Sequence, residues 1–221
     1  MQAYVIVLIV FACIFSLWGL LSLLSLLIYL IPQLVVRILN PLDLKKRYGG
    51  GWCFITGGNS GIGESFAKKV AKIGLNVVIL GQNEERLNKV AADILSINQN
   101  IETKTIKADL SGNPEQVTEE IVQQLSGLDI CIVYFNAGFG NAAQPTKKSL
   151  DQFNTNIVTH QHLFQVLYPR LVNRQLTAKK RGAILFTSSG LGIITTPGSV
   201  VYSATKSYLG HLGECLASEA H

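Results

Sequence analysis

Apolar residues follow two different patterns along this chain of 221 residues. From Ala3 to Ile31 they are nearly continuous, and the first 36 residues contain no Lys, Arg, Asp or Glu. Because roughly 20 such residues in a helix cross the apolar core of a bilayer, we predict a transmembrane anchor at 1–36. The stretch lacks the basic start and short apolar core of a cleaved signal peptide. Gly19 leaves one alternative open, a hairpin that enters the membrane and returns.

Beyond residue 51, short apolar β-rich runs alternate with helical patterns, which is typical of βαβ units around a parallel sheet. The predicted strands are 52–56, 76–80, 103–107, 129–135 and 182–187. The predicted helices are 62–73, 84–97, 114–125, 150–177 and 199–219. With right-handed crossovers the strand order is 3-2-1-4-5. We therefore predict a doubly wound, Rossmann-like α/β domain at 52–221, preceded by the transmembrane helix and a basic linker rich in Gly, with Pro41, at 37–51.

Charge and cysteine usage indicate on which side of the membrane the domain lies. Arg37, Lys45, Lys46 and Arg47 follow the apolar segment and no basic residue precedes it, so the domain is expected on the cytosolic side. The formal net charge of +5 suits anionic headgroups or a CoA-like substrate, although an ordinary soluble surface is the favoured explanation. The four cysteines are scattered without metal or redox spacing, so we expect reduced thiols and no metal site.

A glycine-rich turn, TGGNSGIG at 56–63, lies between the first predicted strand and helix. A strand, such a turn and a helix start direct backbone N–H groups and the positive helix end toward a pyrophosphate. We expect Gly57 to form the tight turn, Gly61 to admit the cofactor and Gly63 to let helix and strand pack closely. The spacing is GxxxGxG rather than GxGxxG, and a glycine loop without a ligand is the competing interpretation.

Tyr202 and Lys206 stand one helical turn apart in YSATK, and Ser189 lies thirteen residues before the tyrosine. Residues at this spacing share a helix face. An ammonium beside a phenol favours the phenolate, so the pair suits proton transfer to a carbonyl oxygen that becomes an alkoxide. The YxxxK pattern alone is common by chance. It becomes informative because the glycine-rich turn is also present upstream.

Together the two motifs resemble the short-chain dehydrogenase/reductase family, from about residue 50 to the C-terminus. Asp109 after TKTIKA, the NAG of Asn136, Ala137 and Gly138 after DICIVYF, and Asn156 in FNTNIVTHQHL follow the family pattern in order. The resemblance implies that Ser189 binds the substrate oxygen, Tyr202 protonates it, Lys206 assists, and Asn156 holds a relay water. It also implies a nicotinamide cofactor that contacts Gly57, Asn59, Ser60, Gly61, Ile62, Gly63, Gln82, Asp109, Asn136, Ala137, Gly138, Tyr202 and Lys206.

The expected cofactor is NADP, with NAD left open. Gly81 and Gln82 end the second strand, where an acid would select NAD and an arginine would accept the 2′-phosphate of NADP. The chain has neither residue there; the lack of the acid and the similarity to lipid-synthesis reductases of the family favour NADP. Gln82 and Asn83 remain candidate donors to the phosphate.

Stretches such as YGGGWCFITGG and RGAILFTSSGLG resemble the membrane-bound branch of 17β-hydroxysteroid dehydrogenases and very-long-chain 3-oxoacyl-CoA reductases. The resemblance implies an endoplasmic reticulum membrane protein that reduces a 3-oxoacyl-CoA in fatty-acid elongation, or a steroid ketone. We expect no nucleic-acid partner and keep a homodimer and a larger membrane complex open.

Family members continue past the Tyr-Lys helix with further strands, whereas this chain stops at His221. We expect strand five to be an open sheet edge and the domain to be C-terminally truncated. A fragment, a product completed by a partner, and a domain that has lost catalysis are all compatible with this ending. The competing function is therefore an accessory or structural subunit of a membrane assembly that keeps the nucleotide fold.

Overall fold

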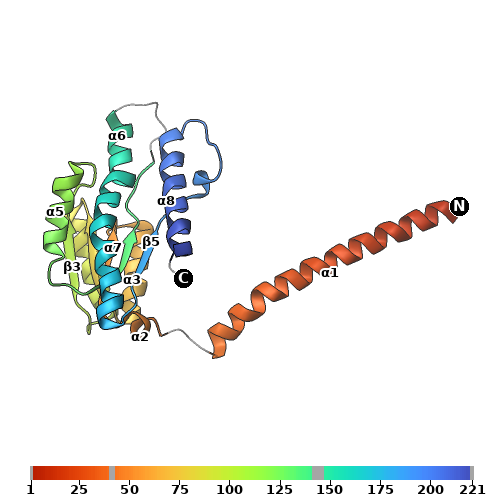
Figure 1. Cartoon of the computed structure of the whole chain (residues 1–221), viewed down its shortest axis with the longest axis horizontal. Coiled ribbons are helices and arrows are strands. Elements are labelled where there is room, and N and C mark those ends of the chain that lie inside the picture. Colours follow the sequence, from red (N-terminus) through yellow and green to blue (C-terminus); the bar gives the residue numbers. More distant parts are fainter. Residues whose placement is uncertain (1, 40–42, 141–146, 220–221) are drawn as a thin grey trace. The chain divides into compact units, whose positions relative to one another are not determined.

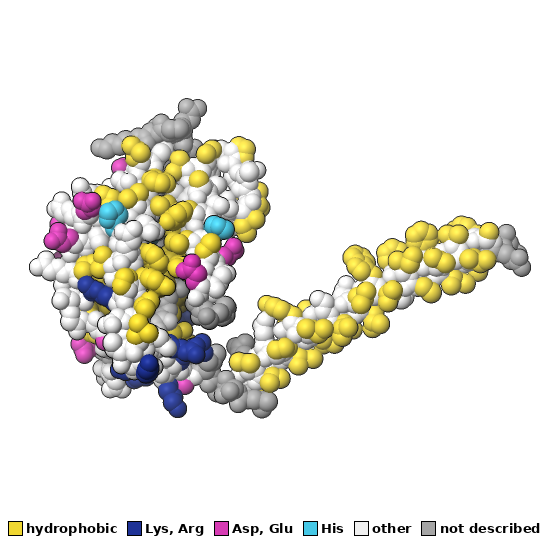
Figure 2. All heavy atoms as spheres, in the orientation of Figure 1, with side chains coloured by type: hydrophobic (Ala, Val, Ile, Leu, Met, Phe, Trp, Pro, Cys, Tyr) yellow, Lys and Arg dark blue, Asp and Glu magenta, His cyan; other side chains and the backbone are white. Residues whose placement is uncertain are grey.

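The computed structural model describes residues 2–39, 43–140 and 147–219, which form two compact units, Met1–Asp43 and Leu44–His221. The first unit is one helix, α1 (Gln2–Leu39), continuous through Gly19 and Pro32. A membrane hairpin would instead reverse direction near Gly19. Its segment Ala3–Val36, 34 residues with a mean hydropathy of 2.7, is long and apolar enough to cross a membrane. Apolar side chains are exposed all along it (Figure 2).

The second unit is built on a five-stranded parallel sheet (Figure 1). The order β3-β2-β1-β4-β5 confirms the predicted Rossmann-like topology. The strands are β1 (Trp52–Thr56), β2 (Asn76–Gly81), β3 (Thr103–Lys107), β4 (Ile130–Phe135) and β5 (Ala183–Phe186). Every residue of β4 is buried, and β1 is buried beyond its first residue, which explains their continuous apolar sequences.

Helices cover both faces of the sheet. On one face α3 (Gly61–Ile73) and α4 (Glu84–Ile97) pack against side chains such as Ile55 and Ile79. On the other, α5 (Pro114–Gln124) and α7 (Thr159–Ala178) pack against Phe54, Val78 and Phe135. The last helix, α8 (Val200–Glu219), lies beside α7, where Tyr208 donates a hydrogen bond to Gln161 (Figure 1).

The helix predicted at 150–177 is interrupted. It consists of α6 (Lys147–Phe153), a π-helical turn at Asn154–Val158, and α7. A π turn widens the helix by one residue and often occurs at functional sites. Asn156 lies in this turn and is fully buried.

The segment predicted as a linker at 37–51 is divided differently. Helix α1 continues to Leu39, while α2 (Leu44–Tyr48) belongs to the second unit. Residues 40–42 lie outside the described residues. Gly49 and Gly50 have positive φ angles of 70° and 72°, so the chain turns sharply from α2 into β1.

Candidate active site

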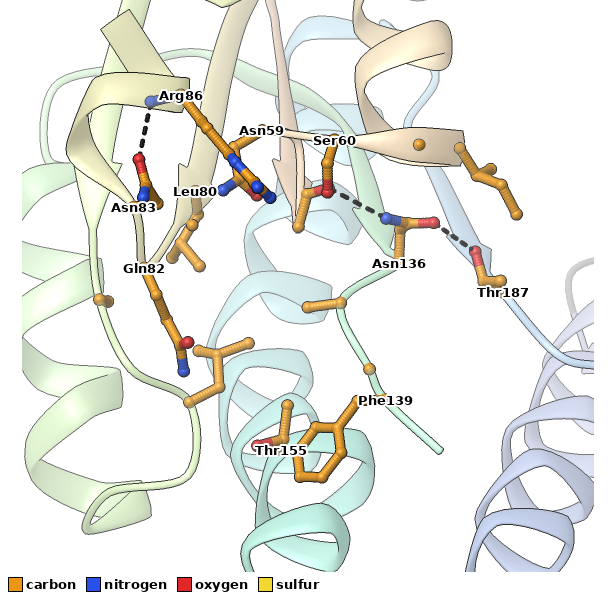
Figure 3. Close-up of a pocket in the computed structure, with 18 of the residues that line it drawn as sticks. Asn59, Ser60, Leu80, Gln82, Asn83, Arg86, Asn136, Phe139, Thr155 and Thr187 are labelled. Atoms are coloured by element: carbon orange, nitrogen blue, oxygen red, sulfur yellow. Dashed lines mark hydrogen bonds between the residues drawn. The ribbon is translucent and has the colours of Figure 1, made fainter. Parts of the chain in front are cut away.

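A cavity of about 510 Å³ opens at the carboxyl ends of β1, β2 and β4 (Figure 3). Ligands of open parallel sheets usually bind in this position. Among the residues predicted for the site, those that line the cavity are Gly57, Asn59, Ser60, Gly61, Ile62, Gln82, Asn136, Ala137, Gly138, Tyr202 and Lys206. Gly63, Asp109, Asn156 and Ser189 do not line it.

The glycine-rich turn connects β1 to α3 at one side of the cavity. Gly57 has a φ of 65°, and a Cβ there would lie 2.9 Å from the Cα of Ala137. At Gly63 a Cβ would lie 2.2 Å from the carbonyl oxygen of Gly57. The turn therefore tolerates no side chain at either position. Helix α3 starts directly at the cavity, so its unpaired N–H groups are available to an anion there.

The NAG segment after β4 is fixed to the end of β1. The hydroxyl oxygen of Thr56 accepts hydrogen bonds from the backbone N–H groups of Asn136 at 2.9 Å and Ala137 at 3.0 Å. The side chain of Asn136 donates to the carbonyl oxygens of Thr56 and Gly57 and accepts a hydrogen bond from Thr187 (Figure 3). Asn136 thus holds the glycine-rich turn and the loop after β5 together at the floor of the cavity.

Tyr202 and Lys206 reach the cavity from α8. The ammonium of Lys206 is 5.7 Å from the centre of the Tyr202 ring and donates to the carbonyl oxygen of Thr187 at 2.7 Å. Lys206 is only 3% exposed, and this burial lowers its pKa. Within the described ranges no residue hydrogen-bonds the Tyr202 hydroxyl, which is therefore available to a ligand.

Asn156 lies behind the cavity lining at Gly138, whereas Ser189 lies in the loop after β5 that also contributes Thr187 to the lining. The Asn156 amide accepts from the N–H of Phe139, and it donates to the Phe139 carbonyl and the Thr205 hydroxyl. It therefore joins the loop after β4 to α8. The Ser189 oxygen accepts a hydrogen bond from the N–H of Leu191 at 3.2 Å. This bond leaves the hydroxyl proton of Ser189 free to donate elsewhere.

His160, which was not predicted as a site residue, is buried at 1% exposure. Its Nε2 lies 3.0 Å from the Thr56 hydroxyl and its Nδ1 lies 3.3 Å from the carbonyl oxygen of Asn156. A carbonyl oxygen can only accept, so the proton of the neutral imidazole lies on Nδ1, and Nε2 accepts a hydrogen bond from the Thr56 hydroxyl, which also lies 3.4 Å from the carbonyl oxygen of Tyr134. Burial and the nearby Lys206 lower the pKa of His160 to about 4, although its hydrogen bond to Asn156 acts in the opposite direction.

The opposite end of the cavity contains Arg86, which the sequence prediction missed. Arg86 lies in the first turn of α4 and not directly after β2, where the family's cofactor-selecting residue was expected. Its side chain extends across the cavity toward Asn59 and Ser60 (Figure 3). Asn83 caps the helix by accepting a hydrogen bond from the N–H of Arg86 at 2.8 Å.

Asp109 and Gln82 are already paired with each other. Gln82 donates to the Asp109 carboxylate at 2.7 Å, and Ser111 donates to it through both its N–H and its hydroxyl. Partial burial acts to raise the pKa of Asp109, but these hydrogen bonds outweigh it and the pKa lies below its ordinary value.

Comparison with known proteins identifies related sequences. The family model described as short chain dehydrogenase matches residues 52–221. Very-long-chain 3-oxoacyl-CoA reductase of Coccidioides immitis (strain RS) is 32% identical over 176 residues, which cover 77% of this chain and 49% of that protein. Human inactive hydroxysteroid dehydrogenase-like protein 1 is 34% identical over 200 residues, which cover 87% and 56%.

A solved structure is also similar. It comes from a study of 7β-hydroxysteroid dehydrogenase stereoselectivity and is 30% identical with a TM-score of 0.73, covering 80% of this chain and 67% of the other. The chain spans about half the length of the curated relatives it matches.

Proposed function

This chain belongs to the short chain dehydrogenase family, and from that premise we propose that it is a membrane-anchored, NADP(H)-dependent reductase of a lipid ketone. A 3-oxoacyl-CoA of fatty-acid elongation is the first choice of substrate and a steroid ketone the second. The observation that carries the proposal is the buried Lys206 ammonium, held by the Thr187 carbonyl next to Tyr202 in the cavity.

The residues present fit a dinucleotide. The side-chain-free turn at Gly57 and Gly63 and the start of α3 suit a pyrophosphate, and Arg86 suits the 2′-phosphate that distinguishes NADP from NAD. Arg86 is an arginine within reach of this site, whereas the residues directly after β2 contain none. When bound, this cofactor supplies the hydride.

The chain's own groups handle the proton. The Tyr202 hydroxyl donates a proton to the ketone oxygen, and the Lys206 ammonium stabilises the phenolate that remains. The free proton of Ser189 hydrogen-bonds the same oxygen and orients the substrate. We assign Asn156 to positioning, because its side chain holds the loop after β4 against α8. The water-anchoring role implied by the family stays a prediction.

Membrane anchoring by α1 is part of the proposal. Its supports are the apolar length of Ala3–Val36 and the exposure of its side chains. We assign the endoplasmic reticulum membrane from the similarity to very-long-chain 3-oxoacyl-CoA reductases. The cytosolic orientation follows from the charges at Arg37, Lys45, Lys46 and Arg47.

A second candidate is an accessory subunit that keeps the fold without catalysis. The similarity to a relative named inactive, at 34% identity, favours it. The presence of Ser189, Tyr202 and Lys206 favours the enzyme, because a site without catalysis has no need of a buried lysine beside a tyrosine.

One experiment separates the two candidates. The full chain, reconstituted in lipid nanodiscs, is mixed with NADPH and either a long-chain 3-oxoacyl-CoA or a steroid ketone, and loss of NADPH absorbance is followed. Reduction of either substrate supports the enzyme and identifies its substrate class. NADPH binding without reduction of any ketone supports the accessory subunit.

A further inference from the structure

Two basic segments lie at the end of the second unit opposite the cavity. One is α2, with Lys45, Lys46 and Arg47, and the other is the loop between α7 and β5, with Lys179, Lys180 and Arg181. We call these six residues the basic end. All six are exposed, and Figure 2 shows Lys and Arg side chains gathered where α2 lies in Figure 1.

The topology dictates this position. The strands are parallel, and the two segments lead into the amino ends of β1 and β5. The cavity lies at the carboxyl ends of the strands. The basic end and the cavity therefore occupy opposite edges of the same sheet, separated by the length of a strand.

A buried arginine fixes the two basic segments together. Arg174, 7% exposed, donates to the carbonyl oxygen of Tyr48 at the end of α2 and to that of Arg181, each at 2.6 Å. Its Nε also donates to the Asp129 carboxylate at 2.6 Å. The guanidinium thus holds like-charged segments side by side although they repel, so their arrangement is part of the fold.

The chain connects the basic end closely to α1. Only residues 40–43 separate α1 from α2, and a chain of this length extends no more than about 18 Å. If α1 crosses a bilayer, as proposed above, α2 stays within that distance of the point where α1 ends. Phosphatidylserine and phosphatidylinositol give the cytosolic leaflet a negative charge that attracts basic residues close to a membrane helix.

We propose that the basic end docks on anionic lipid headgroups beside the membrane anchor, so that the cavity opens away from the bilayer. This inference rests on the proposed anchoring by α1. The arrangement favours a ketone carried on a water-soluble group such as CoA over one that leaves the bilayer laterally. Favourable interaction with helix dipoles is an alternative reason for basic residues at this end. It applies to Lys179, which lies at the negative end of α7, but not to the residues of α2, because a helix of five residues has little dipole.

The test uses the full chain in nanodiscs of phosphatidylcholine with or without phosphatidylserine. A single fluorophore is attached at Thr177→Cys, near the basic end, or at Ile193→Cys, which is 90% exposed and remote from it. The exposed thiols are removed by Cys13→Ser and Cys215→Ser, while Cys53 and Cys131 are buried. Energy transfer to a headgroup-labelled lipid then reports which edge faces the bilayer.

We expect strong transfer from position 177 and weak transfer from position 193, and only in discs with phosphatidylserine. The double variant Lys179→Glu/Arg181→Glu should lower the ratio of docked to undocked protein at least roughly fivefold for each charge removed. The matched variant Lys69→Glu/Lys89→Glu, with the same charge change at exposed positions of α3 and α4, should leave it unchanged.

Equal transfer in the two lipid compositions, or stronger transfer from position 193, would overturn the docking. An alkaline wash of vesicles that carry the chain distinguishes this result from failure of the anchor. Release of the chain overturns the anchoring and the docking together, whereas retention with lipid-independent transfer overturns the docking alone.

Discussion

The buried His160 makes the stability of the second unit sensitive to mild acid. In the folded chain the imidazole is neutral, because Thr56 donates to Nε2 and burial opposes protonation. Its pKa falls from the ordinary 6.5 to about 4. The unfolded chain therefore takes up a proton first, so the stabilisation is complete above pH 6.5 and is lost as pH falls toward 4.

The magnitude follows from that difference in pKa. At about 1.4 kcal/mol for each pH unit, the whole fall is worth about 3 kcal/mol, of which about 2 kcal/mol is lost between pH 7 and pH 5. The carboxylates with shifted pKa values titrate outside this pH range. The pKa values of Asp93, Asp109 and Asp129 are held below their ordinary value of 3.8, so these carboxylates titrate at lower pH.

The assay is urea denaturation of the full chain in a neutral detergent, followed by the fluorescence of Trp52 in β1 with Trp18 replaced by Phe. We compare the fall in unfolding free energy from pH 7 to pH 5 in this chain and in its His160→Gln variant. The variant should show a fall smaller by about 2 kcal/mol, whatever its stability at pH 7. An equal fall in the two proteins would refute the neutral, buried imidazole.

Three further variants test other parts of the account. Arg86→Ala should weaken NADPH binding by about 10- to 100-fold, because a charged hydrogen bond to the 2′-phosphate is lost. The same variant should leave NADH binding unchanged. Titration calorimetry measures both affinities, and Lys89→Ala, one turn along α4, is the control. Gly63→Ala should abolish binding of either nucleotide, since the new Cβ would lie 2.2 Å from a backbone oxygen. Arg174→Ala should lower the unfolding free energy by about 2 to 3 kcal/mol, whereas the exposed Arg170→Ala should change it by less than about 0.5 kcal/mol. The role of Arg86 is contradicted if NADPH and NADH binding weaken equally in Arg86→Ala, and that of Gly63 if nucleotide binding stays intact in Gly63→Ala. An unchanged denaturation midpoint in Arg174→Ala would contradict the stabilising role of Arg174.

The sheet was readily predicted from sequence because its signals are local. Buried parallel strands appear as uninterrupted apolar runs, as in ICIVYF of β4, and glycine or asparagine marks the turns between elements. The strand order then follows from right-handed crossovers. The π turn at Asn154–Val158 escaped prediction because one additional residue in a helix turn leaves no distinct periodicity.

The missed site residues are those whose roles depend on distant parts of the chain. His160 lies four residues after Asn156 and three before Leu163, which is the spacing of a buried helix face, and this signal could have indicated its burial. Its partner Thr56 is 104 residues away, so no local pattern reveals the hydrogen bond. Arg86 was overlooked because a helix start, rather than the end of a strand, brings its side chain over the cavity.

We assign the protonation of a ketone in this cavity to Tyr202. The most direct test compares the chain with its Tyr202→Phe variant, measuring the NADPH dissociation constant and the rate of reduction of a long-chain 3-oxoacyl-CoA in the same nanodiscs. Tyr208→Phe, which removes an exposed hydroxyl from the same helix, is the matched control. We predict unchanged NADPH binding and a rate about 10² to 10⁴ lower in Tyr202→Phe alone. Undiminished reduction by Tyr202→Phe would contradict the assignment.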